Sequence, residues 1–185
     1  MTATIDEALR AGFERLARLP CPNADTEELL GRLLGLSRAA LYLERGRPLD
    51  AAMRARFESW LARRAAGEPV QYITGRAAFR GLDLAVSPAV LIPRPETEGL
   101  VEAVLGILGA ERARWSAPRV LDLGTGSGAI ALALAAECPA ASVVATDSSP
   151  EALEVAGSNV AALGLGGRVR SRAPWRARCR SRRWR

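Results

Sequence analysis

Histidine and lysine are both absent from this chain of 185 residues, and cysteine occurs only three times, at Cys21, Cys138 and Cys179. A chain without histidine has neither a Ser-His-Asp nor a Cys-His mechanism, and it offers no imidazole ligand to a metal. The cysteines lie far apart and form no CxxC pair, which argues against a zinc site or a disulfide framework. We therefore expect a cytoplasmic protein that binds no metal.

Long apolar runs and aromatic residues are also scarce. No apolar run approaches the roughly 20 residues that a membrane-spanning helix needs, so we expect no membrane partner. The first ten residues, MTATIDEALR, place an acid before any base and contain no apolar stretch, which argues against a secretion signal. Aromatic residues are 5% of the chain whereas Ala, Leu and Gly are plentiful, which favours a helix-rich soluble protein.

The positive charge of the chain is unevenly distributed. All 26 basic residues are arginines, a bias that indicates a GC-rich coding sequence, and with 20 acidic residues they give a net charge of +6. Nine of the arginines lie in residues 168–185, a segment without any acidic residue. Residues 1–167 hold 17 arginines against 20 acidic side chains, a net charge of −3. The basic character therefore belongs to the final segment.

Residues 1–75 have the periodicity of several short helices, and we expect them to form a helical bundle. Residues 25–28, Asp-Thr-Glu-Glu, have the form of a capping box ahead of a run of leucines. Asp50 is the expected N-cap of a long helix that ends at Gly67. The apolar residues of these helices are predicted to form the core: Ile5, Leu9, Phe13, Leu16, Leu29, Leu30, Leu33, Leu34, Met53, Phe57, Trp60 and Leu61.

Residues 76–96 change from helical to extended character, and we expect a hairpin linker there. Leu82 and Leu84 alternate with less apolar residues at the period of a strand, and residues 90–92 form a second short β-type run. Prolines at positions 88, 93 and 95 forbid a helix through this stretch. Thr97 is the expected cap of the helix that follows.

Residues 97–167 are predicted to form part of an α/β domain. A short apolar strand at 120–123 is followed by the glycine-rich loop 124–128 and a helix over 129–137. A second strand covers 142–147, and another helix begins at Pro150. This strand–helix–strand–helix order begins an open parallel, Rossmann-like sheet.

The glycine-rich loop carries the strongest functional signal. Glycines between a strand and a helix let the backbone approach a ligand closely, and the helix N-terminus then faces that ligand. Asp147, nineteen residues beyond Gly128, ends the next strand, where an acid can accept hydrogen bonds from ribose hydroxyls. The loop is neither the GxGxxG of dinucleotide folds nor a P-loop. The residues that we predict to bind a nucleoside cofactor are Gly124, Thr125, Gly126, Ser127, Gly128 and Asp147.

Three stretches resemble known families. Residues 121–128, LDLGTGSG, are similar to the first motif of class I S-adenosylmethionine methyltransferases. Residues 67–75, GEPVQYITG, and 86–98, VSPAVLIPRPETE, resemble the HemK/PrmC family of peptide chain release factor N5-glutamine methyltransferases. The resemblance covers roughly residues 5–167 and is strongest between Gly67 and Asn159.

The resemblance implies S-adenosylmethionine as cofactor and peptide chain release factors as partners. Such enzymes have a helical bundle that helps to dock the release factor, a hairpin linker and a class I methyltransferase domain. That domain methylates the side-chain amide of the glutamine in a Gly-Gly-Gln loop. Asp122 would lie near the methionine end of the cofactor, and Trp175 would match a tryptophan near its adenine.

The family's catalytic Asn-Pro-Pro-Tyr loop has no counterpart, since none of the eleven prolines is followed by another proline. No catalytic residue can therefore be assigned, and we expect the chain to be inactive. The family pattern and the charge balance both fail near residue 168, which suggests a frameshift or premature end and a partial methyltransferase domain over 97–167. Translation of the other reading frames tests this hypothesis, because an Asn-Pro-Pro-Tyr codon series should follow in one of them.

Two alternatives stay open at this point. An amino-methyltransferase that acts on DNA adenine or ribosomal RNA would share the glycine-rich loop, although residues 92–98 favour the release factor enzyme. Alternatively, the arginine-rich tail, 168–185, with Trp175 and Trp184, could bind RNA through phosphate contacts and base stacking. Nucleic acid is expected as a partner only through that tail.

Overall fold

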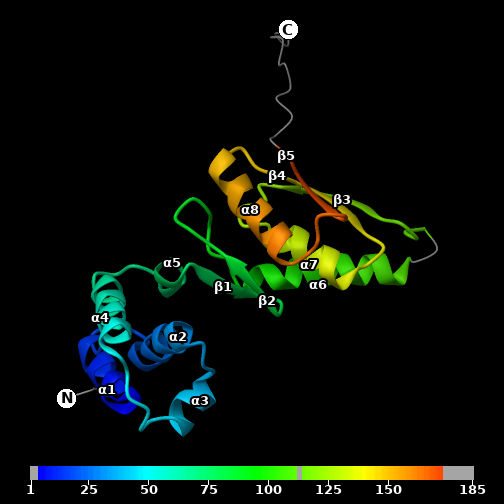
Figure 1. The fold of residues 1–185 in the computed structure, drawn as a ribbon. Coiled ribbons are helices and arrows are strands. Elements are labelled where there is room, and N and C mark those ends of the chain that lie inside the picture. The colour runs from blue at the N-terminus through cyan, green and yellow to red at the C-terminus, as the bar shows by residue number, and fades with distance from the viewer. Residues whose placement is uncertain (1–3, 112–113, 173–185) are drawn as a thin grey trace. The chain divides into compact units, whose positions relative to one another are not determined.

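The computed structural model describes residues 4–111 and 114–172, which form two compact units that meet in the sequence at Gly75 and Arg76. The first unit is helical, and the second combines a hairpin, three helices and a three-stranded sheet (Figure 1). In the first unit the helices are α1 (Ile5–Arg15), α2 (Pro22–Leu34), α3 (Arg38–Leu43), α4 (Ala51–Ala65) and α5 (Val70–Thr74).

The helical unit is built around the apolar stripes that the sequence predicts. Its core includes the fully buried Ile5 and Leu29 together with Phe57 and Trp60. Helices α1 and α2 cross at Gly12, where a Cβ atom would lie only 2.4 Å from Cγ2 of Thr26. The close approach of the two helices therefore depends on the missing side chain at that position.

Side-chain caps fix the ends of several helices. The Asp50 carboxylate accepts the Met53 N–H at 2.7 Å, which confirms the predicted N-cap of α4. The capping box expected at residues 25–28 is wrong, because α2 begins earlier, with Pro22 at its first position. Asp25 instead forms an ion pair with Arg64 of α4 at 2.8 Å. The Thr26 hydroxyl turns back to the Pro22 carbonyl at 2.7 Å, as an intrahelical threonine often does.

The second unit begins with the predicted hairpin, in which β1 (Arg76–Phe79) pairs antiparallel with β2 (Leu82–Ala85). The expected strand at 90–92 is absent from the described structure, because prolines on both sides leave that stretch as a turn followed by irregular backbone. Helix α6 (Glu96–Ala110) starts before Thr97, which is therefore not its cap. The Arg80 guanidinium ties the hairpin turn to Glu137, with Nε 2.6 Å from Oε1.

Residues 119–172 form a parallel sheet in the order β3-β4-β5, with each strand paired to its neighbour in sequence. Its strands are β3 (Arg119–Leu123), β4 (Ser142–Thr146) and β5 (Val169–Arg172), connected by α7 (Ala129–Glu137) and α8 (Pro150–Ala162). Strand β5 lies inside residues 168–185, which were predicted to be a tail outside the domain. That prediction is wrong for residues 169–172, because they pair with β4 and the buried Val169 continues the apolar core. The arginine-rich segment thus contributes to the sheet as far as Arg172.

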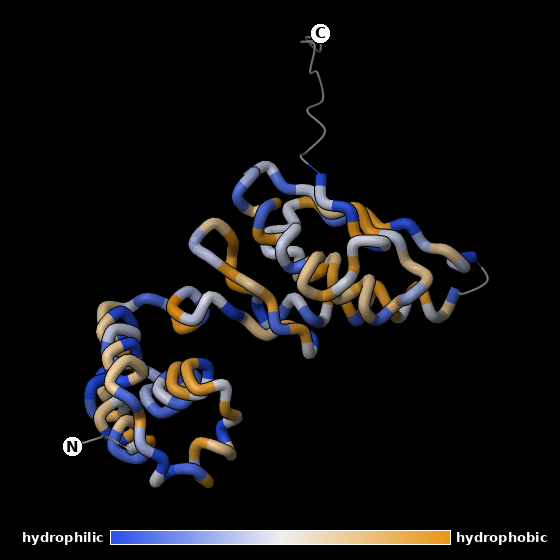
Figure 2. The backbone as a smooth tube through the Cα atoms, viewed as in Figure 1, coloured by the Kyte–Doolittle hydropathy of each residue, from blue (hydrophilic) through white to orange (hydrophobic). Residues whose placement is uncertain are grey.

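The sheet packs its helices on one side. Val143 and Ala145 of β4 point into the core formed with α7, and both are buried. Leu121 and Leu123 of β3 point the other way and are 60% and 76% exposed. Among the described residues no helix covers that face, as Figure 1 shows, and Figure 2 shows apolar residues along the strands. Parallel sheets are ordinarily covered on both faces, whereas the face of Leu121 and Leu123 is an open apolar surface among the described residues.

Candidate functional site

The glycine-rich loop lies between the end of β3 and the start of α7. Gly124, Gly126 and Gly128 all have positive φ angles, of 75°, 55° and 85°. The Gly124 and Thr125 N–H groups both donate to the Thr146 carbonyl, at 2.8 and 2.9 Å, which anchors the loop to the end of β4. The loop is therefore held at the carboxyl edge of two adjacent parallel strands, where ligands bind in open α/β sheets.

The glycines differ in what surrounds them. A Cβ atom at Gly126 would meet no atom within 4 Å, and the same is true at Gly124. A Cβ atom at Gly128 would lie 3.1 Å from Cδ1 of Leu132 and 3.4 Å from Cβ of Ala156. The first two glycines thus line open space in front of the loop, whereas Gly128 packs α7 against α8.

Asp147 follows β4 directly, and its carboxylate reaches the loop. Oδ2 accepts the Gly126 N–H at 2.9 Å, and Oδ1 accepts the Ser149 N–H at 3.0 Å. Backbone N–H groups of Ser149, Gly126 and Ser148 hold the pKa of the Asp147 carboxyl below its ordinary value, against the opposing effect of partial burial. The side chain is thereby kept ionised beside the loop, with lone pairs left on both oxygens.

Asp122 is a second carboxyl group beneath the loop. It is 8% exposed, and its Oδ2 accepts the Thr125 hydroxyl at 2.6 Å. Burial raises the pKa of the Asp122 carboxyl, and the charge of Asp147 adds to that rise, whereas hydrogen bonds from Thr125 and the Ala131 N–H oppose it. Two carboxyl groups therefore interact electrostatically at the loop, which favours a cationic ligand there.

Asn159 of α8 supports the loop from behind, and the sequence analysis does not include it among the site residues. Its side chain is 1% exposed, and its amide nitrogen donates to the Ser127 carbonyl at 2.9 Å. The same amide group binds the backbone of Ala85 at the end of β2. A single asparagine within a helical pattern carries no signal for such a role, because exposed asparagines look the same in sequence.

The structure brings six of the seven predicted site residues together. Gly124, Thr125, Gly126, Ser127 and Gly128 form the loop itself, and Asp147 is hydrogen-bonded to it. Trp175 lies outside the described residues.

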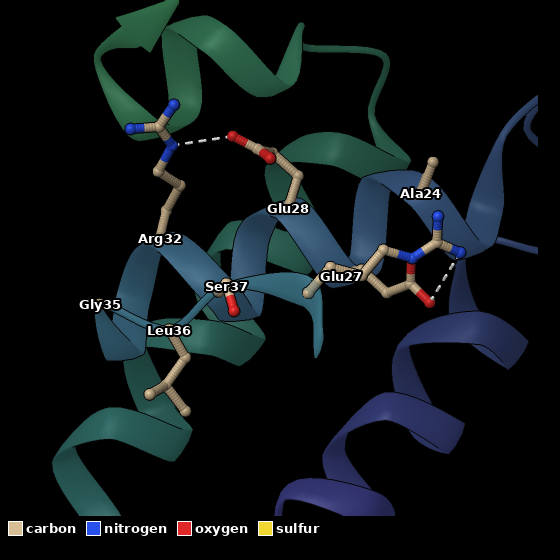
Figure 3. A pocket seen from close by; sticks show the side chains of 9 residues that line it. Ala24, Glu27, Glu28, Arg32, Gly35, Leu36 and Ser37 are labelled. Atoms are coloured by element: carbon tan, nitrogen blue, oxygen red, sulfur yellow. Dashed lines mark hydrogen bonds and ion pairs between the residues drawn. The ribbon is translucent and has the colours of Figure 1, made fainter. Parts of the chain in front are cut away.

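A separate cavity of about 660 Å³ lies in the helical unit and shares no residue with the loop (Figure 3). Its charged side chains are paired with one another, Glu28 with Arg32 at 2.8 Å and Glu27 with Arg38 at 2.7 Å. The Tyr42 hydroxyl also donates to Glu27, and this hydrogen bond raises the pKa of Tyr42 above its ordinary value. Because these charged side chains already have partners within the helical unit, the cavity is a weaker candidate for a ligand site than the glycine-rich loop.

Within residues 4–111 and 114–172 no group of three or more acidic or cysteine side chains is arranged to hold a metal ion. None of the helices in this described part has the length and apolar character needed to cross a membrane.

Known families match residues in both units of the chain. Residues 7–75 match the model of the PrmC N-terminal domain, and residues 120–174 match that of a methyltransferase domain. A release factor glutamine methyltransferase from Koribacter versatilis is 49% identical over 162 residues, which cover 86% of this chain and 56% of that protein. The corresponding protein from Burkholderia pseudomallei is 47% identical over 161 residues, or 87% of this chain and 53% of that protein. Over most of its length the chain is therefore similar to release factor glutamine methyltransferases.

These matches confirm the resemblance, the α/β methyltransferase fold class and S-adenosylmethionine as the cofactor of the proteins that the chain resembles. The chain spans about half the length of the curated relatives it matches. Among solved structures, the N-terminal domain of human METTL16 aligns with 68% of this chain and 45% of its own, at 21% identity and a TM-score of 0.42.

Proposed function

We propose that residues 76–172 bind S-adenosylmethionine at the glycine-rich loop, as the cofactor-binding part of an enzyme that methylates peptide chain release factors. One observation carries the proposal, namely the ionised carboxylate of Asp147 bound to the Gly126 N–H beside open space. A backbone that leaves room for a ligand and an acceptor for hydroxyl groups are the two elements of a nucleoside site.

The residues present fit this cofactor in shape and charge. The open space at Gly124 and Gly126 leaves room for the cofactor, and Asp147 would accept hydrogen bonds from its ribose hydroxyls. Asp122 adds a second carboxyl group near the same loop. S-adenosylmethionine supplies an electrophilic methyl group on a positively charged sulfur, and negative potential at the loop favours that charge.

Methyl transfer to a glutamine amide needs more than cofactor binding. The amide nitrogen is a poor nucleophile, because its lone pair is delocalised into the carbonyl group. A catalyst must align that nitrogen with the methyl group and accept hydrogen bonds from its N–H bonds. The family's Asn-Pro-Pro-Tyr motif, which would do this, does not occur in this sequence. We therefore expect cofactor binding without appreciable methyl transfer.

Calorimetric titration with S-adenosylhomocysteine tests the cofactor site. We expect saturable binding, and we expect Asp147→Ala to weaken it at least about tenfold, because a charged acceptor is lost. Asp83→Ala is the matched control, since Asp83 is an exposed acid on β2 that pairs with Arg76. Absence of binding to the unaltered chain, or equal affinity of the Asp147→Ala variant, would contradict the proposal.

Substrate class is tested with methyl-labelled S-adenosylmethionine and three acceptors. These are a release factor, the same factor with its Gly-Gly-Gln glutamine replaced by alanine, and ribosomal RNA. Label on the unaltered release factor alone would show that this chain methylates the Gly-Gly-Gln glutamine, and it would contradict the inactivity that we expect. Label on RNA would favour the nucleic-acid alternative. Deletion of residues 173–185, which leaves β5 intact, tests whether the arginine-rich segment binds RNA in a salt-dependent way.

A further inference from the structure

Asn159 occupies a position where three parts of the second unit meet. Its side chain, 1% exposed on α8, makes three hydrogen bonds to main-chain groups. Oδ1 accepts the Ala85 N–H at 2.7 Å, and Nδ2 donates to the Ala85 carbonyl and to the Ser127 carbonyl, both at 2.9 Å. One buried amide thus joins the end of the hairpin to the glycine-rich loop.

The chemistry of these partners fixes the orientation of the amide. An asparagine side chain offers two donors and one acceptor group, and here both donors face carbonyls while the acceptor faces an N–H. The reversed orientation would place its oxygen against two carbonyl oxygens. The side chain therefore binds Ala85 as another strand would, through both its N–H and its carbonyl group, and uses its remaining donor on the loop.

Only one of the two joined segments, the glycine-rich loop, belongs to the proposed cofactor site. Ser127 is 2% exposed and lies between Gly126, whose N–H binds Asp147, and Gly128, which starts α7. On the other side, Ala85 leads into residues 86–95, which are anchored by the buried Val86 and Val90. A change at Asn159 would release both segments at once.

We infer that Asn159 is a positioning residue that fixes the glycine-rich loop for cofactor binding and couples it to residues 86–95. It acts through the Ser127 carbonyl and does not itself line the open space before the loop. This inference rests on the proposed function for its ligand, although the positioning itself can be tested without one.

Hydrogen–deuterium exchange of the free protein tests the positioning directly. In Asn159→Asp the acceptor for Ala85 remains, but the nitrogen that carries both donors becomes an oxygen that faces two carbonyls. We expect faster exchange of the amides of residues 124–128 and of Ala85, with little change at β4. Asn159→Leu, which removes all three hydrogen bonds, should do the same. Val160→Ala is the matched control, because it removes buried volume from the same helix but no hydrogen bond to the loop.

Titration with S-adenosylhomocysteine then tests the consequence. At a temperature where all variants are folded, we expect the Kd to rise at least about tenfold in both Asn159 variants and to stay near the unaltered value in Val160→Ala. In the unaltered chain the ligand should also slow exchange at Ala85, and this slowing should vanish in Asn159→Asp.

The two measurements separate two kinds of failure. Unchanged exchange at residues 124–128 in Asn159→Asp, or an equal change in Val160→Ala, would overturn the positioning role. If the unaltered chain fails to bind S-adenosylhomocysteine, the proposed cofactor site falls, and exchange in the free protein alone decides the role of Asn159. If Asn159→Leu does not fold, Asn159→Asp alone decides the outcome.

Discussion

Gly126→Ala and Gly128→Ala should both lose stability and affinity, but the larger loss of stability and the larger loss of affinity should fall on different variants. Both residues have positive φ, which costs an alanine about 1–2 kcal/mol, and the stiffer unfolded chain returns about 0.4–1 kcal/mol. Gly126→Ala should therefore cost about 1 kcal/mol. Gly128→Ala also forces a methyl group to within 3.1 Å of the buried Leu132, and overpacking adds about 1–3 kcal/mol.

The affinity for S-adenosylhomocysteine should fall more in Gly126→Ala than in Gly128→Ala, the reverse of the order for stability. The methyl group of Gly126→Ala enters the open space before the loop and should abolish or strongly weaken binding of S-adenosylhomocysteine. Gly128→Ala points away from that space, so its affinity should fall less once the protein is folded. Denaturant unfolding followed through exchange of the α7 amides, together with calorimetry, measures both quantities. Equal loss of stability in the two variants, or unaltered affinity of Gly126→Ala, would refute this account of the loop.

Three other predictions concern different parts of the molecule. Gly12→Ala should destabilise the helical unit by about 1–3 kcal/mol in thermal unfolding, because its Cβ would lie 2.4 Å from Thr26, although alanine has the higher helix propensity. A stabilised variant would contradict the close approach of α1 and α2. The native pKa of Asp147 lies below its unfolded value, so the stability it contributes is present above about pH 4 and is lost as pH falls further. In Asp147→Asn the free energy of unfolding should fall less steeply below about pH 4. An unchanged fall would show that other groups cause the loss of stability in acid. Replacing the exposed Leu121 and Leu123 together by serine should reduce binding of a hydrophobic dye and change stability by less than about 0.5 kcal/mol; a larger loss would show that the two side chains are buried.

The elements of the second unit could be predicted where local signals agree. Helix α7 begins and ends as expected, at Ala129 and Glu137, because the glycine-rich loop marks its start and an apolar pattern fills it. Strands β3 and β4 followed from short apolar runs bounded by turn residues. Sequence patterns of this kind need no knowledge of tertiary contacts.

The errors arose where one local signal competes with another. Residues 25–28 satisfy a capping pattern, yet Pro22 already starts α2 and leaves Asp25 free to pair with Arg64, thirty-nine positions away. The five-residue helix α5 was missed because five residues are too few to show a helical repeat of apolar side chains. Asn159 was missed because its partners, Ala85 and Ser127, lie 74 and 32 positions away in sequence. No local rule reports contacts at such separations.

The order of the strands has a consequence for synthesis. Neighbours in the sheet are also neighbours in the chain, so the sheet grows in one direction as the polypeptide emerges from the ribosome. Every residue of the loop site and its support has been made once Asn159 has emerged. The glycine-rich loop is therefore complete in the nascent chain. The outer edge of β3, which pairs with no strand of the described sheet, is a template for pairing with another polypeptide both during synthesis and afterwards.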